Sequence, residues 1–93
     1  MIHYIIVKWK DGADKGRLSD EAETLFSNAV DVCGVKNVKV SKNIVDRKNR
    51  YDIMIAIEME RQSLENWDKS ELHARWKEQY SEFIENKCIF DCE

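Results

Sequence analysis

Two histidines are the side chains of this 93-residue chain best suited to proton transfer. An imidazole changes charge near pH 6.5, roughly, so it can serve as acid or base in neutral solution. His3 lies on the expected helix-facing side of an N-terminal strand, and His73 begins the apolar stripe of an expected helix. Both rings could border one cavity between helices and sheet, with His73 as the candidate base and His3 as a candidate pocket residue. The alternative is a structural role for both, in packing or at a strand end in solvent.

Large apolar side chains could line such a cavity. Indole and phenol rings form flat apolar walls, which suit a ring-shaped or polyketide-like ligand. The alternative is that these side chains form the core and touch no ligand. The candidate ligand-binding residues are Trp9, Trp67, Trp76, Tyr80 and Ile53.

The cysteines and carboxylates do not indicate a metal or redox site. The chain has an odd number of cysteines, and no two of them have the spacing of a zinc knuckle. They are Cys33, Cys88 and Cys92. No carboxylate–histidine cluster has metal-ligand spacing, so we expect neither a metal nor a cofactor. We expect the cysteines to be small buried hydrophobes in a reducing compartment. Asp52 and Asp91 are expected to be hydrogen-bonded at sheet ends rather than paired for acid–base work.

Composition narrows the class of protein. The chain is 43% hydrophobic and 35% charged, as is typical of a soluble globular domain, and its net charge is -3. A domain that binds nucleic acid is normally basic, so we do not expect that partner. No apolar run approaches the roughly 20 residues that span a bilayer, and no secretory leader is recognisable. We therefore expect one cytoplasmic domain over residues 1–93, with no membrane partner.

Alternation of apolar residues predicts the strands. It is clearest from Tyr51 to Met59, where every second residue is large and apolar, as in a strand with one buried side. Ile2 to Lys10 is apolar on both faces, which is typical of a central strand. Val35 to Ile44 is rich in lysine and suits an edge, and a polar turn joins it to the strand at Tyr51 as an antiparallel hairpin. The last expected strand is Lys87 to Cys92.

Spacings of three and four predict the helices. Apolar residues from Leu18 to Cys33 form an amphipathic helix that begins near Asp14 or Ser19 and ends at Gly34. Arg61 to Lys69 reads as a short helix, and Ser70 can cap the next one. That last helix is expected over Glu71 to Ile84. Its apolar stripe is expected to contain His73, Trp76, Tyr80, Phe83 and Ile84.

The order strand, helix, strand, strand, two helices, strand fits an α+β, ferredoxin-like βαββααβ fold. Its four-stranded antiparallel sheet would have helices on one face only. A large apolar patch on the other face is typical of an interface. We therefore expect a homodimer through the open sheet face, in which two sheets close a barrel around a two-fold axis. The open face is expected to carry Ile2, Tyr4, Ile6, Met54 and Ala56.

Five short motifs resemble the stress-responsive A/B barrel family, also called the dimeric α/β barrel or Dabb family. The run from His3 to Gly12, HYIIVKWKDG, resembles the opening of that family. The other similar pieces are Gly34-Val35 before a strand, Arg50-Tyr51-Asp52, Glu71-Leu72-His73 and Ile89-Phe90-Asp91. Together they cover essentially all of the chain in order and spacing. The resemblance implies a homodimer whose sheets face each other.

The family includes plant boiling-stable stress proteins and a plant polyketide cyclase, and most bacterial members have no assigned activity. In the cyclase, a histidine on the last helix is the general base and a tyrosine on the preceding short helix assists it. The resemblance places His73 at that histidine and His3 at a second one on the first strand. The tyrosine position holds Trp67, which cannot act as an acid or a base.

Two functions remain open from the sequence. The first is a dimeric small-molecule binding or stress-related protein, which takes a small apolar or aromatic ligand between helices and sheet and does no chemistry. The second is a cofactor-independent, cyclase-like lyase with His73 as general base. A monooxygenase of the antibiotic-biosynthesis type shares the dimeric barrel but matches the motifs less well. A cavity that reaches both His3 and His73 would favour the enzyme, and a filled interior would favour the binding protein.

Overall fold

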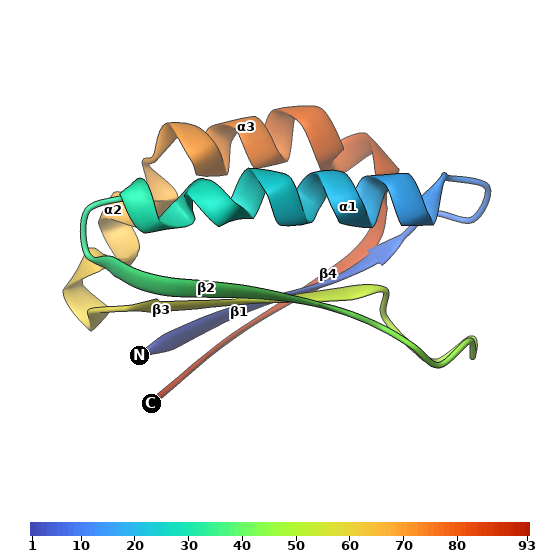
Figure 1. Cartoon of the computed structure of the whole chain (residues 1–93), viewed down its shortest axis with the longest axis horizontal. Coiled ribbons are helices and arrows are strands. Elements are labelled where there is room, and N and C mark those ends of the chain that lie inside the picture. The colour runs from blue at the N-terminus through green and yellow to red at the C-terminus, as the bar shows by residue number, and fades with distance from the viewer.

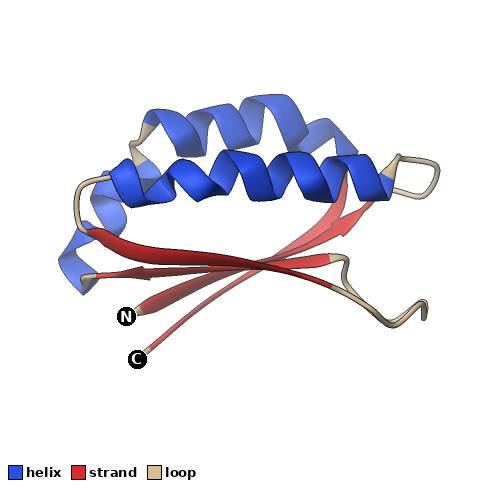
Figure 2. Cartoon of the chain, viewed as in Figure 1, coloured by secondary structure: helices blue, strands red, loops and turns tan.

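A computed structural model describes all residues, 1–93, and has a four-stranded antiparallel sheet with every helix on one face (Figures 1 and 2). The sheet order is β2-β3-β1-β4, so the two most apolar strands are central. This is the ferredoxin-like fold that the sequence predicts. The elements are β1 (Ile2–Trp9), α1 (Lys15–Phe26), η1 (Ser27–Asp31), β2 (Val35–Lys42), β3 (Ile53–Met59), η2 (Arg61–Ser63), α2 (Leu64–Asp68), α3 (Glu71–Tyr80), η3 (Ser81–Phe83) and β4 (Ile84–Cys92).

Several elements begin or end a few residues away from the expected positions. The strand expected from Tyr51 starts at Ile53. At the end of the sheet, just before it, the Asp52 carboxylate accepts a hydrogen bond from the Trp9 backbone N–H at 2.7 Å. The helix over Leu18 to Cys33 begins at Lys15 with Asp14 as its N-cap, which is one of the two predicted starts, but it tightens into the 3-10 helix η1 after Phe26. The last two helices likewise end in or begin with short 3-10 turns. Local side-chain and backbone hydrogen bonds set these boundaries, and apolar periodicity does not record them.

The core lies between the helices and the covered sheet face. Alternate residues of β1 and β3 point toward the helices, and all of these but His3 are apolar and buried. Helices α1 and α3 lie side by side over them (Figure 1) and contribute Leu18, Ala22, Phe26, Leu72, Trp76 and Tyr80. The rings of Phe26 and Trp76 meet edge to face with centroids 4.9 Å apart. Aromatic side chains from β1, α1 and α3 therefore meet in the interior.

Gly34 allows one close approach in this packing. It follows η1 with φ +91, a conformation that side-chain-bearing residues rarely adopt. A Cβ placed on Gly34 would lie 1.9 Å from Ser63 Oγ and 2.4 Å from Ser63 Cβ. The start of β2 and the turn η2 therefore pack against each other through a position that only glycine fits.

The open face of the sheet carries the apolar residues that the sequence places there. Ile2, Tyr4, Ile6 and Ala56 are half-buried by their neighbours on the sheet, and Met54 is 37% exposed. Phe90 of β4 lies directly opposite Tyr4 and is 59% exposed. No helix covers this face (Figure 2). Within this chain alone, an apolar surface thus lies open along the centre and one edge of the sheet.

The cysteines differ from the sequence prediction. Cys33 and Cys88 are exposed and Cys92 is half-buried, and all three are free. The expectation of buried cysteines was wrong because Cys33 lies just after η1, and β4 is an edge strand whose residues are mostly exposed. None of the helices is both long enough and apolar enough to traverse a lipid bilayer.

Candidate functional site

His3 lies on the covered face of β1, as expected, and is buried. Its Nδ1–H donates to the Asp91 carboxylate with an N–O distance of 2.5 Å. The two residues are direct neighbours in the β1–β4 ladder, so the pair joins the exposed edge strand to the centre of the sheet. Asp91 and Asp52 are thus both hydrogen-bonded at ends of the sheet, which confirms that prediction.

His73 lies at the edge of the apolar stripe of α3 rather than within it. The buried residues of this helix are Leu72, Trp76 and Tyr80 at spacings of four. At about 100° per residue, His73 falls beside Tyr80 at one margin of the stripe, so it shares the predicted face only at its edge. His73 is half-buried, with its ring centroid 5.4 Å from that of Trp67. Its Nδ1–H donates to the Asp68 carbonyl at 3.0 Å, which leaves Nε2 as the proton-accepting nitrogen of the neutral ring.

The candidate ligand-binding side chains are closely packed. Trp9, Trp67, Trp76 and Ile53 are all 2% exposed or less, and Tyr80 is 7% exposed. Trp9 Nε1 donates to Ser19 Oγ at 3.0 Å, whereas Trp67 Nε1 is buried without a partner. Tyr80 donates its hydroxyl to Glu21 at 3.1 Å, and burial, together with this bond, raises the pKa of the phenol. Around the sheet centre these residues form core.

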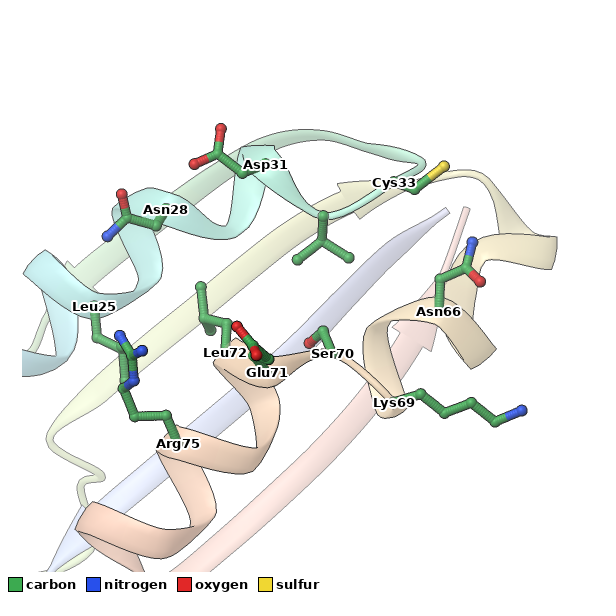
Figure 3. A pocket seen from close by; sticks show the side chains of 11 residues that line it. Leu25, Asn28, Asp31, Cys33, Asn66, Lys69, Ser70, Glu71, Leu72 and Arg75 are labelled. Carbon is green, nitrogen blue, oxygen red and sulfur yellow. The ribbon is translucent and has the colours of Figure 1, made fainter.

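A cleft of about 480 Å³ lies in the helical layer instead, where α1 and η1 face the turn between α2 and α3 (Figure 3). Its apolar surface comes from Leu25, Val32, Leu72 and Cys33, and its rim is polar. Neither histidine lines it. The residues are Leu25, Asn28, Asp31, Val32, Cys33, Asn66, Lys69, Ser70, Glu71, Leu72 and Arg75.

A second hollow of about 700 Å³ continues the cleft along the groove between α1 and α3. The two share Leu25, Asn28 and Arg75, so these residues mark where they join. Tyr80 is the candidate ligand-binding residue that reaches this second hollow, through its hydroxyl end. Sequence analysis missed the junction because Leu25 has core spacing and Arg75 looks like an ordinary surface residue.

The charged side chains that line the first cleft differ in whether they have a partner within the chain. Lys69 donates to Glu65 at 2.8 Å, and Figure 3 shows it extending away from the other lining residues. Arg75 forms no ion pair or side-chain hydrogen bond within the chain, and Figure 3 shows it reaching from α3 toward α1, where Leu25 lies. Asp31 and Glu71 also line the cleft, and neither has an ion-pair partner. No group of three or more potential metal-ligating side chains is found in the fold.

Comparison with solved structures places this fold among ferredoxin-like proteins. A dimeric protein of unknown function from Bacteroides fragilis superposes with a TM-score of 0.84 at 13% identity, over 99% of this chain and 93% of the other. The fold is ferredoxin-like. A Dabb family protein from Mesorhizobium loti matches with a TM-score of 0.73 at 11% identity, over 99% and 93% of the two chains. The sequence resemblance to the Dabb family therefore agrees with the observed fold.

An enzyme with the same fold is also similar. The hydroxynitrile lyase from Passiflora edulis gives a TM-score of 0.76 at 12% identity, over 96% of this chain and 87% of the enzyme. No protein-family model and no curated protein sequence matches the chain. At these identities, the comparisons establish architecture alone.

Proposed function

We propose that this protein is a homodimeric, Dabb-type, cytoplasmic binding protein for a small molecule with an apolar body. Its ligand occupies the cleft between α1, η1 and the α2–α3 turn. The observation that carries the proposal is the contrast in packing: aromatic side chains fill the space near the sheet centre, while the helical layer leaves about 480 Å³ open over Leu25, Val32 and Leu72. A pocket of this volume and mixed lining is typical of small-molecule sites.

The dimer is supported by the open sheet face. Tyr4, Phe90 and Met54 form an apolar surface on neighbouring strands, and a surface of this kind on a soluble protein usually meets a partner. A second copy of the chain is the partner best supported, because structurally similar proteins are described as dimeric. Sheets that meet face to face direct their helices outward, so the helical cleft stays accessible in the dimer. Three free cysteines support a reducing compartment.

Binding can be tested with N-phenyl-1-naphthylamine, an uncharged fluorescent probe with an apolar ring system. We expect saturable fluorescence enhancement, and amide chemical-shift changes that centre on Asn28, Val32 and Leu72 in NMR spectra. Leu25→Asp places a charge on the apolar wall and should weaken the probe at least about tenfold.

Ile44→Asp is the matched control, because it makes the same kind of change at a loop residue that is 95% exposed. It should bind the probe like the natural protein. Shifts confined to Tyr4 and Phe90, or equal loss of binding in both variants, would contradict a ligand cleft in the helical layer.

A lyase with His73 as base is the second candidate function. It is supported by the neutral-ring geometry, in which the Asp68 carbonyl holds Nδ1–H and leaves Nε2 free to accept a proton. The structural similarity to a hydroxynitrile lyase suggests the reaction class to test. There the base would remove the hydroxyl proton of a hydroxynitrile, the carbon–carbon bond would break, and the departing cyanide would take up a proton.

Lyase activity can be measured as the release of aldehyde and cyanide from an aromatic hydroxynitrile. Activity above the buffer rate that falls at least about a hundredfold in His73→Ala would support it. His73→Gln preserves much of the side-chain size and a donor for Asp68, so it separates lost packing from the lost base. Equal rates in His73→Ala and the natural protein would eliminate His73 as the base.

A further inference from the structure

At and beside the point where the two helical hollows join, the exposed side chains of Arg75, Asn28 and Gln79 carry hydrogen-bond donors with no partner within the chain. Arg75 and Asn28 line both hollows, and Gln79 lines the second. None of the three side chains has a hydrogen bond or ion pair within the chain. A guanidinium group presents five N–H donors in a planar fork, and each amide adds two more.

Several other charged side chains that line the two hollows are already paired within the chain. In the second hollow, Asp20 pairs with Lys42, and Glu21 pairs with Arg17 at 2.7 Å and accepts from Tyr80. In the first hollow, Lys69 is held by Glu65. Arg75 is therefore the unpaired cation among the residues that line either hollow.

We propose that the cleft takes an amphipathic anion, with a single carboxylate, sulfonate or phosphate group held by Arg75 and an apolar body over Leu25, Leu72 and Val32. This inference rests on the proposed binding function and names its ligand class. An oxyanion matches a guanidinium fork through two parallel hydrogen bonds, and amide donors from Asn28 and Gln79 complete its surroundings.

The same rim limits the number of charges on the ligand. Asp31 and Glu71 line the first hollow but not the second, and they have no ion-pair partner. A second anionic group at that end would lie among like charges. The apolar body therefore extends over Leu72 and Val32, and the anionic group remains at Arg75.

Two probes that differ by one sulfonate test this assignment. 1-Anilinonaphthalene-8-sulfonate carries the anion, and N-phenyl-1-naphthylamine is the same ring system without it. In Arg75→Gln we expect binding of the sulfonate to weaken about tenfold, as for one lost charge-assisted contact, and binding of the neutral probe to weaken by less than about twofold. Raising the salt concentration should weaken the sulfonate alone, because exposed charges are screened.

Arg61→Gln is the matched control: it removes the same charge from η2, outside both hollows, and should change neither affinity. Equal affinity of the sulfonate for Arg75→Gln and the natural protein would overturn the anion site. Equal weakening of both probes would also overturn it, since Arg75 would then act only as part of the cleft wall. If the neutral probe still binds at Leu25 in either case, the proposed binding function survives; if it does not bind there, that function fails separately.

Discussion

The two faces of the sheet are built from similar residues and differ in what covers them. On the covered face, Ile5, Ile55 and Trp9 lie under two helices and are 2% exposed or less. On the open face, Tyr4, Met54 and Phe90 come from the same strands and from β4, and they remain partly exposed. One face therefore stabilises the single chain, whereas the other would add stability only in the proposed dimer. Because buried side chains fill the space over the covered face, the candidate ligand cleft lies in the helical layer above it.

The largest effect should come from Trp76→Ala on the covered side. Trp76 is 1% exposed and packs against the rings of Trp9, Phe26 and Tyr80, so its removal leaves a large cavity. We expect the free energy of unfolding to fall by about 3–5 kcal/mol in urea denaturation. Phe90→Ala, measured on dilute protein, should cost less than about 1 kcal/mol. If Trp76→Ala and Phe90→Ala lowered the free energy of unfolding by similar amounts at every protein concentration, the distinction between the two faces would be contradicted.

Gly34→Ala should cause the next largest loss of stability. It tests how closely the start of β2 packs against η2 at one end of the covered side. The new Cβ would meet Ser63 and would also require an unfavourable backbone conformation. We expect a loss of about 2–4 kcal/mol in thermal or urea unfolding. Gly12→Ala is the matched control, because Gly12 also has positive φ but nothing within 4 Å of its added Cβ, and should lose only about 1 kcal/mol. Equal losses would show that the contact with Ser63 is unimportant.

A smaller effect is expected where β4 is joined to the rest of the sheet. Asp91→Asn weakens the bond to buried His3 and should cost about 1–2 kcal/mol in unfolding free energy. A double-mutant cycle with His3→Gln measures the coupling of the two side chains, and hydrogen exchange of β4 amides reports whether the edge strand loosens. Additive losses from the two substitutions would mean that the pair does not hold β4.

The smallest effect concerns Tyr80 at alkaline pH. Its pKa is raised above the ordinary value of 10.0 by burial and by the bond to Glu21, so the folded state retains the phenol proton more strongly than the unfolded state. This stabilisation is fully present below the unfolded pKa and is lost as the pH rises through the folded pKa. Above pH 10, the unfolding free energy should therefore decline more steeply than in Tyr80→Phe. Parallel pH profiles would contradict the raised pKa.

The sequence predicts the fold well because apolar periodicity records what each element buries. Alternation from Tyr51 to Met59 locates a central strand, observed over Ile53–Met59, and the position of Gly34 locates the end of the helical segment after the first strand. Boundaries such as the break after Phe26 depend on local hydrogen bonds that periodicity does not contain.

The candidate site is harder to predict for the same reason. Trp67 and Trp76 look equally suited to a pocket wall or a core, and only their packing distinguishes the two. Arg75 is a candidate binding residue because its side chain has no partner within the chain and lies where two hollows meet. The spacing of residues along the chain does not reveal that position. His73 lies at the margin of the buried stripe, where it is half-buried against Trp67 rather than within the core.

The most direct test of the contrast between the faces is sedimentation equilibrium of the natural chain and Phe90→Asp at micromolar concentration. We expect a particle of twice the 11.0 kDa chain mass for the natural protein, and a shift toward single chains when a charge is placed opposite Tyr4. The helical content of the variant, measured by circular dichroism, should be unchanged. A natural protein that sediments as a single chain, with Tyr4 and Phe90 left in water, would contradict it.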